Sequence, residues 1–187
     1  MRPLLALSGV ELSLRVASPP DAEEMALHVA DAALIACPET RASLPRPLSV
    51  ARAHHAARDG SQLDEAQVVS LRDGAALGRF EPPVGRYCAL EVIVTPAEAL
   101  DGWTLRARGA GPDGARWAAD GYAIGRWRLP LEAPLEIDAD APPAALDLVV
   151  DPAAALASVD TESAVEDLGL DLLLAIERGA VAVGRRP

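Results

Sequence analysis

Apolar and polar residues alternate over several short stretches of this chain, as they do in β-strands that have one wet face. In residues 9–17, for example, Val10, Leu12 and Leu14 are separated by single polar residues. The same alternation, punctuated by turn residues, predicts further strands over 66–71, 76–80, 87–95, 103–108, 115–124, 126–132, 134–138 and 145–151. Many short strands with frequent turns are typical of an all-β sandwich or barrel.

Residues 25–37 allow two interpretations. Apolar residues alternate from Met25 to Val29, the pattern is interrupted at Asp31, and it then resumes. A strand with a β-bulge near Asp31 accounts for the interruption. A helix over 21–36 is the alternative, because alanine and glutamate, which are frequent there, are good helix formers.

The end of the chain has a helical period instead. One apolar stripe repeats every three to four residues and consists of Val165, Leu168, Leu172 and Ile176. Ser163 and Glu166 have the spacing of a capping box, and Gly179 stands where a glycine ends such a helix. We therefore predict one domain over 1–187, an all-β, immunoglobulin-like antiparallel β-sandwich with a helical tail at about 162–179.

Residues 38–65 are the least regular part of the chain and predict a long surface loop. Loops of this length in compact domains are usually functional or disordered. The loop contains His54 and His55, and the third histidine, His28, lies on the polar side of the strand predicted over 25–37. Imidazole is the commonest transition-metal ligand, so these histidines are candidate ligands for copper or zinc. The alternative is that His54 and His55 are ordinary solvated residues.

The charge of the chain narrows the choice of partners. It carries 28 acidic and 17 basic side chains, a formal net charge of −11, and every basic residue is an arginine. Clustered cations supply the affinity for phosphate, so this charge argues against nucleic acid and anionic membrane. No stretch of about 18 apolar residues is present to span a membrane.

The two cysteines indicate the compartment. Cys37 and Cys88 occupy the apolar phase of their predicted strands, so both are expected to point into the core and to be able to form a disulfide. A disulfide favours an oxidising compartment, and we expect a periplasmic or secreted protein. Two free buried thiols in a reducing cytosol are the alternative.

Catalytic motifs give little support for an enzyme. Gly109–Gly114 matches GxGxxG, but Pro112 removes a backbone donor and Asp113 adds a repelling charge, so we interpret it as a hairpin turn. No GxSxG sequence is present, and neither cysteine has a histidine at a known family spacing. A small hydrolase with paired carboxylates remains a third hypothesis.

Three segments resemble the periplasmic copper-binding family encoded beside methanobactin genes, together with its secreted relatives. They are Leu27–Ile35, Gly121-Tyr122, and Leu146–Asp151 leading into 155–160. The resemblance implies a secreted β-sandwich that binds copper through histidines and an oxidised tryptophan, for which Trp127 is the candidate.

These observations lead to two functional hypotheses. The first is a non-catalytic protein that binds copper at His54 and His55, with His28 as a further ligand. The second is an interaction module that recognises a protein or glycan without metal. A shallow cluster of Trp103, Trp117 and Trp127 on one face would favour the second hypothesis.

Overall fold

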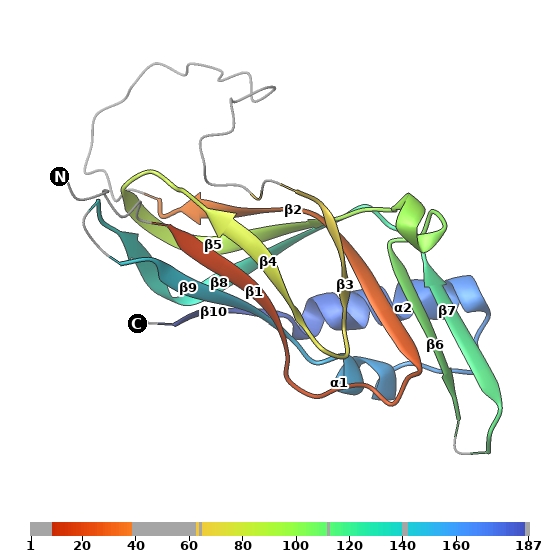
Figure 1. Ribbon diagram of the computed structural model, residues 1–187. Coiled ribbons are helices and arrows are strands. Elements are labelled where there is room, and N and C mark those ends of the chain that lie inside the picture. The colour runs from red at the N-terminus through yellow and green to blue at the C-terminus, as the bar shows by residue number, and fades with distance from the viewer. Residues whose placement is uncertain (1–8, 39–62, 64, 112, 140–141, 186–187) are drawn as a thin grey trace.

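The computed structural model describes residues 9–38, 63, 65–111, 113–139 and 142–185 (Figure 1). These residues form ten strands, two α-helices and one 3₁₀ turn, η1. In chain order they are β1 (Val10–Val16), β2 (Glu24–Ala36), β3 (Gln67–Ser70), β4 (Ala75–Phe80), β5 (Gly85–Val94), η1 (Glu98–Leu100), β6 (Leu105–Ala110), β7 (Arg116–Gly121), β8 (Gly125–Ile137), β9 (Ala144–Val150), α1 (Pro152–Ala157), α2 (Val165–Gly179) and β10 (Val181–Arg185).

The strands form one curled, mixed sheet that resembles half a barrel (Figure 1). Its order is β4-β1-β9-β10-β8-β5-β2-β6-β7, and β3 pairs with β2 beside this path. A mostly β fold with a C-terminal helix is therefore confirmed. The all-antiparallel arrangement is wrong, because β1 runs parallel to β9 and β10 runs parallel to β8. Parallel neighbours arise because α1, α2 and other long connections return the chain to the sheet in the same direction.

The segment for which both a strand and a helix were considered forms a strand, β2. Its pairing with β5 shifts register between Val29 and Asp31, which confirms the bulge near Asp31. The bulge moves the buried phase from Val29 to Ala32, so one thirteen-residue strand keeps its apolar side chains on the core side of the sheet. This long strand pairs with β6 through its first half and with β5 through its second half.

The concave side of the sheet encloses a core of leucine, valine and alanine side chains. Aromatic side chains are scarce, so aliphatic residues supply most of the buried volume. The largest fully buried side chains are Trp127, Leu12, Met25, Leu27, Leu71, Leu90, Leu105, Leu146, Leu148, Leu168 and Leu172.

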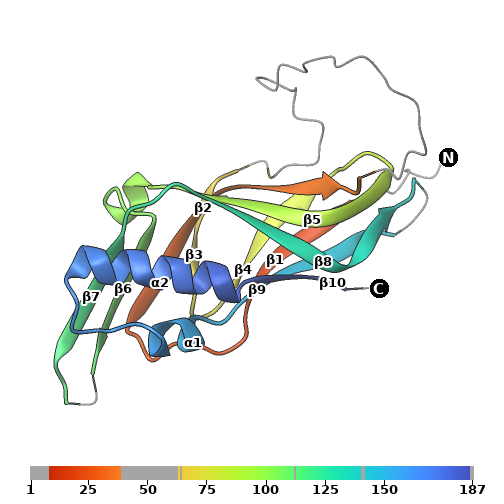
Figure 2. The same ribbon diagram turned by 180° about the vertical axis from the view of Figure 1, so that it is seen from behind.

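Helix α2 crosses β6 and β7 on one face of the sheet (Figure 2). Backbone meets backbone at the crossing: a Cβ on Gly169 would lie 2.3 Å from the carbonyl carbon of Asp120 and 2.4 Å from the nitrogen of Gly121. The predicted apolar stripe is buried at Leu168, Leu172 and Ile176. Glycine is therefore required at the point where the helix rests on the strand.

The predicted ends of this helix need correction. The helix begins at Val165 with Ala164 as its N-cap, and no side chain caps it, so the capping box of Ser163 and Glu166 is wrong. Gly179 is the last helical residue and Ala180 is the C-cap. Neither α1 nor β10 was expected from the pattern, because both are short and β10 has little polar alternation.

The last strand, β10, lies inside the sheet, between β9 and β8. It pairs with five residues of β9 but with β8 only through Ala182 and Leu131. Beside it lies Asp147 of β9, which is 0% exposed. Arg185 donates from Nη2 to Asp147 Oδ1 at 2.7 Å, and Arg15 Nη1 lies 3.7 Å from Oδ2. The buried carboxylate of Asp147 thus links β10 to β9 and, through the longer contact with Arg15, to β1.

The disulfide between Cys37 and Cys88 is confirmed, and it joins the end of β2 to β5. The expected inward orientation is wrong, because both cysteines are only half buried. Register shifts between Ile35 and Ala36 and between Tyr87 and Ala89 move both positions out of the core phase. Alternation identifies both strands, but the bulges change the face of the sheet on which each cysteine lies.

Replacing Gly169 by alanine should destabilise the fold by about 1–3 kcal/mol, because the new methyl group has no space against the β7 backbone. The matched control is Gly179→Ala in the same helix, where nothing lies within 4 Å of the added Cβ. Alanine at Gly179 should be neutral or slightly stabilising. Urea unfolding of both variants measures the difference, and equal midpoints would contradict the close contact.

Removing the disulfide in the Cys37→Ser, Cys88→Ser variant should lower the free energy of unfolding by about 4 kcal/mol. The expectation follows from the 51-residue separation of the two cysteines, since the crosslink restricts a long loop of the unfolded chain. Urea unfolding of oxidised wild type and of the double variant is the measurement. An unchanged free energy would show that the crosslink adds nothing to this fold.

Removing Arg185 should cost more stability than removing Arg15, although both side chains are more than half exposed. Arg185→Ala leaves a buried acceptor without its 2.7 Å donor, at a cost of about 1–3 kcal/mol. Arg15→Ala, the control, removes a longer contact, 3.7 Å, made by an arginine that is 65% exposed, and should cost less than about 1 kcal/mol. Thermal unfolding compares the two, and the reverse order would mean that Arg15 is the main partner of Asp147.

Candidate functional site

The described structure contains only one of the three predicted metal ligands, His28. His54 and His55 lie outside the described residues. His28 is half buried on β2, and its Nδ1 lies 2.8 Å from the carbonyl oxygen of Thr95 and 3.3 Å from Thr95 Oγ1. Among the residues that the structure describes, no group of three or more histidine, cysteine, aspartate or glutamate side chains is placed to hold a metal ion.

The tryptophans do not form the shallow cluster that would have favoured the interaction module. Trp127, the candidate for a modified tryptophan, belongs to β8, and its side chain is 1% exposed in the core. Trp103 forms an isolated bridge with Ala97 next to η1, and Trp117 lies on β7. Trp117 borders the two cavities described below.

Gly111 and Gly114 take part in a hairpin turn between β6 and β7, which confirms the interpretation of the GxGxxG sequence. Gly111 donates its N–H to the carbonyl of Ala115, and Gly114, with a φ of 80°, donates to the carbonyl of Gly111. Strands β6 and β7 continue from this turn in unbroken antiparallel register, with Gly109 opposite Trp117. The turn therefore projects a regular two-stranded ribbon.

Strand β7 is the last strand of the sheet, and within the described residues it pairs only with β6. Hydrogen-bonded and non-bonded positions alternate along an antiparallel pair. Counting from the bond between Gly111 and Ala115, Trp117 and Ala119 turn their backbone groups toward β6. The N–H and C=O groups of Arg116 and Ala118 consequently point away from the sheet.

The strand at the opposite end of the order, β4, has a less regular edge. Its pairing with β1 shifts register next to Gly78, whose φ is 140°. The side-chain amide of Gln67 also donates to the carbonyl of Leu77. Bulges and side-chain bonds are common ways to block an edge. Strand β7 shows no register shift, and the bond from Arg108 Nη1 to the carbonyl of Ala119 lies on its β6 side, so the outer edge of β7 is open within the described residues.

Two cavities flank β7. The first, of about 520 Å³, lies against the turn and the segment that leads into α2, and its lining includes Asp113, Glu162 and Ser163. The second, of about 550 Å³, reaches the start of β2, and its lining includes Glu23, Glu24, Arg108 and Gly109. Both cavities share Arg116, Trp117, Ala118 and Val165, and we call these four residues with the two cavities the β7 edge site.

Gly109, which lies opposite Trp117, leaves room for the indole ring. A Cβ on Gly109 would lie 2.4 Å from Cζ2 of Trp117, so the indole covers the bare backbone of Gly109. Trp117 also packs against the core, and Val165, 42% exposed, begins α2 beside it. The apolar floor of the site is therefore held by a strand, a helix and a glycine.

The charged side chains around the site leave an acidic surplus. Arg116 pairs with Glu23 at 3.2 Å, and Arg108 pairs with Asp120 at 2.7 Å. The cavities also contain the carboxylates of Glu24, Asp113 and Glu162. Their linings together hold four carboxylates, with Glu23 included, and two guanidinium groups, Arg108 and Arg116. This surplus attracts cationic groups.

Part of this site could have been found from the sequence. Once the turn is placed at Gly111–Gly114, counting outward puts Trp117 opposite Gly109, and such a pair marks a bare backbone covered by an aromatic ring. No local sequence pattern predicts that Glu162 and Val165 lie beside β7, because their position depends on how α2 crosses the sheet.

Comparison of the chain with protein-family models, curated proteins and solved structures gives no match. The resemblance to the copper-binding family therefore stays a prediction. None of the helices in the described part of the chain is long and apolar enough to cross a membrane.

Proposed function

We propose that this protein is a non-catalytic interaction module that binds a partner polypeptide at the β7 edge site. The observation that carries the proposal is the pair of cavities that share Arg116, Trp117, Ala118 and Val165 beside an open strand edge. Their volumes fall in the range of binding clefts, and an aromatic floor with a polar rim is the usual composition of an interface.

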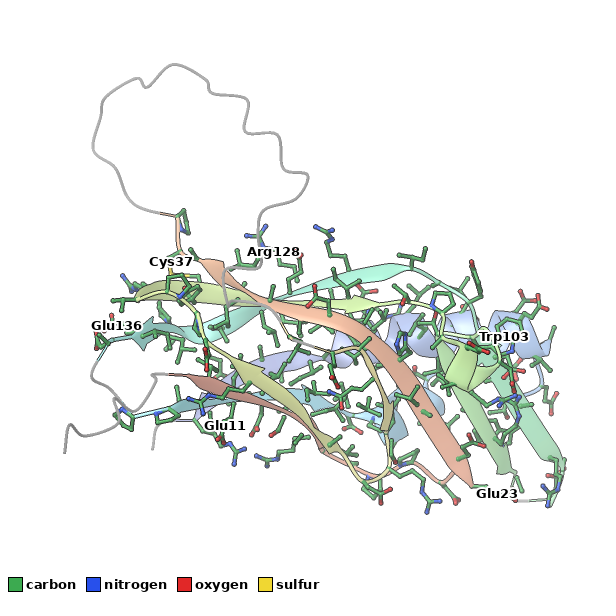
Figure 3. All side chains as sticks on the ribbon, turned by 45° about the horizontal axis from the view of Figure 1, so that its top comes forward. Glu11, Glu23, Cys37, Trp103, Arg128 and Glu136 are labelled. Carbon is green, nitrogen blue, oxygen red and sulfur yellow. A yellow bond between two sulfur atoms is a disulfide. The ribbon has the colours of Figure 1, made fainter. Side chains whose placement is uncertain are left out.

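We also propose a periplasmic or secreted location. The Cys37–Cys88 disulfide supports it, because disulfides persist in oxidising compartments and are rare in the cytosol. The disulfide lies at the opposite end of the molecule from Glu23, which lines the second cavity (Figure 3). It can therefore stabilise the scaffold without taking part in the site.

Copper binding by His54 and His55, with His28 as a further ligand, remains a prediction from the sequence. It concerns a different part of the chain, so the interaction module neither needs copper nor excludes it. The small hydrolase likewise remains a hypothesis.

A displayed random-peptide library, selected against the oxidised protein, should yield peptides with a surplus of lysine and arginine. Hydrogen exchange with a selected peptide bound should show protection at 115–118 and 161–165. Glu162→Lys should weaken that peptide about five- to tenfold, since one exposed attraction becomes a repulsion. Isothermal titration calorimetry measures the affinities.

The control is Glu136→Lys, an equally simple charge reversal of an exposed residue at the far end of β8 (Figure 3). It changes the net charge by the same amount and should leave the affinity nearly unchanged. If both substitutions weakened peptide binding equally, the effect would come from the overall charge of the protein and not from Glu162. Protection confined to another surface would contradict the site.

A further inference from the structure

We propose that the partner contributes a short, extended, basic segment that pairs with β7 as an added strand of the sheet. This inference rests on the proposed function and specifies what the β7 edge site recognises. It requires a backbone free to pair, space for side chains beside the strand edge, and a charge that fits the partner.

The backbone requirement is met by Arg116 and Ala118. Their N–H and C=O groups point away from β6, because the groups of Trp117 and Ala119 face it. The same parity appears one strand further in, where the carbonyls of Thr104 and Arg108 accept from His28 and Glu23 of the β2 side. An added strand would therefore find up to four backbone hydrogen bonds over three residues of β7.

The side-chain requirement is met by the two cavities. A segment lying along β7 would find space for its side chains in the first cavity, beside Glu162 and Ser163, and in the second, beside Glu23 and Glu24. One strand explains why two separate cavities share the same stretch of β7.

Charge distinguishes the partner from a second copy of this chain. The cavity linings hold four carboxylates and two arginines, and the whole chain carries a net charge of −11. Two copies meeting at this edge would bring like charges together, whereas a segment with lysine or arginine at alternate positions would meet the surplus carboxylates. The regular register of β7 also contrasts with the bulged edge of β4.

The probe is a fluorescently labelled peptide of four Lys-Val repeats with blocked ends, titrated by anisotropy against the full oxidised chain. Amide exchange by NMR should show the N–H groups of Arg116 and Ala118 slowed by the peptide, with those of Trp117 and Ala119 unchanged. Ala118→Pro removes one outward donor and should weaken binding about tenfold. Ala118→Ser keeps the N–H, so it should bind the peptide more tightly than Ala118→Pro, and its own affinity measures the effect of the side chain alone.

A second probe leaves the protein untouched. The same peptide with every backbone nitrogen methylated keeps its charges and side chains but loses its donors, and it should bind at least about tenfold more weakly. Equal binding of both peptides would overturn strand addition, whether or not Ala118→Pro folds.

The remaining outcomes separate the two proposals. Peptide binding with protection at 161–165 but not at Arg116 and Ala118 overturns strand addition and leaves the proposed function standing. No saturable binding of the Lys-Val peptide overturns the basic segment, and the library selection then decides the proposed function by itself. A dimer of the chain that Ala118→Pro dissociates would put a second copy at this edge and overturn the choice of partner.

Discussion

The contact between Gly169 of α2 and the β7 backbone at Asp120 and Gly121 governs the C-terminal part of this molecule. Helix and strand approach so closely there that neither Gly169 nor Gly121 has room for a Cβ atom. The contact fixes where α2 begins and the path it takes across the sheet. Since β10 follows the helix after the single residue Ala180, it also determines where the last strand enters the sheet.

Two features of the structure follow from that contact. At one end of α2, Val165 and the segment before it come to lie beside β7 and close the first cavity against the hairpin turn. At the other end, β10 fills the position between β9 and β8, where Arg185 meets the buried carboxylate of Asp147. One helix therefore builds the candidate site and completes the sheet.

Much of the local structure could be predicted from the sequence. Alternation located most strands, the interruption at Asp31 identified a bulge, and Pro112 and Asp113 distinguished a hairpin turn from a phosphate loop. These features are local, and a few neighbouring residues determine them. The disulfide was also predicted, although bulges left its cysteines half buried.

Long-range arrangement was harder to predict. The parallel pair β8–β10 depends on where α1 and α2 return the chain, and the pair β1–β9 joins strands that are far apart in the sequence. No local pattern encodes either pairing. The capping box at Ser163 had suitable residues but the helix begins later, at Val165. The site was missed for the same reason: Trp117 and Glu162 are far apart in sequence, and only the helix crossing brings them to one cavity.

The account depends most on β7 having an open edge, and amide exchange of the oxidised protein without ligand tests this directly. NMR should show rapid exchange at Arg116 and Ala118 and slow exchange at Trp117 and Ala119, since only the second pair is bonded to β6. Uniform protection of all four amides would mean that something already covers this edge, and it would contradict both the site and the function proposed for it.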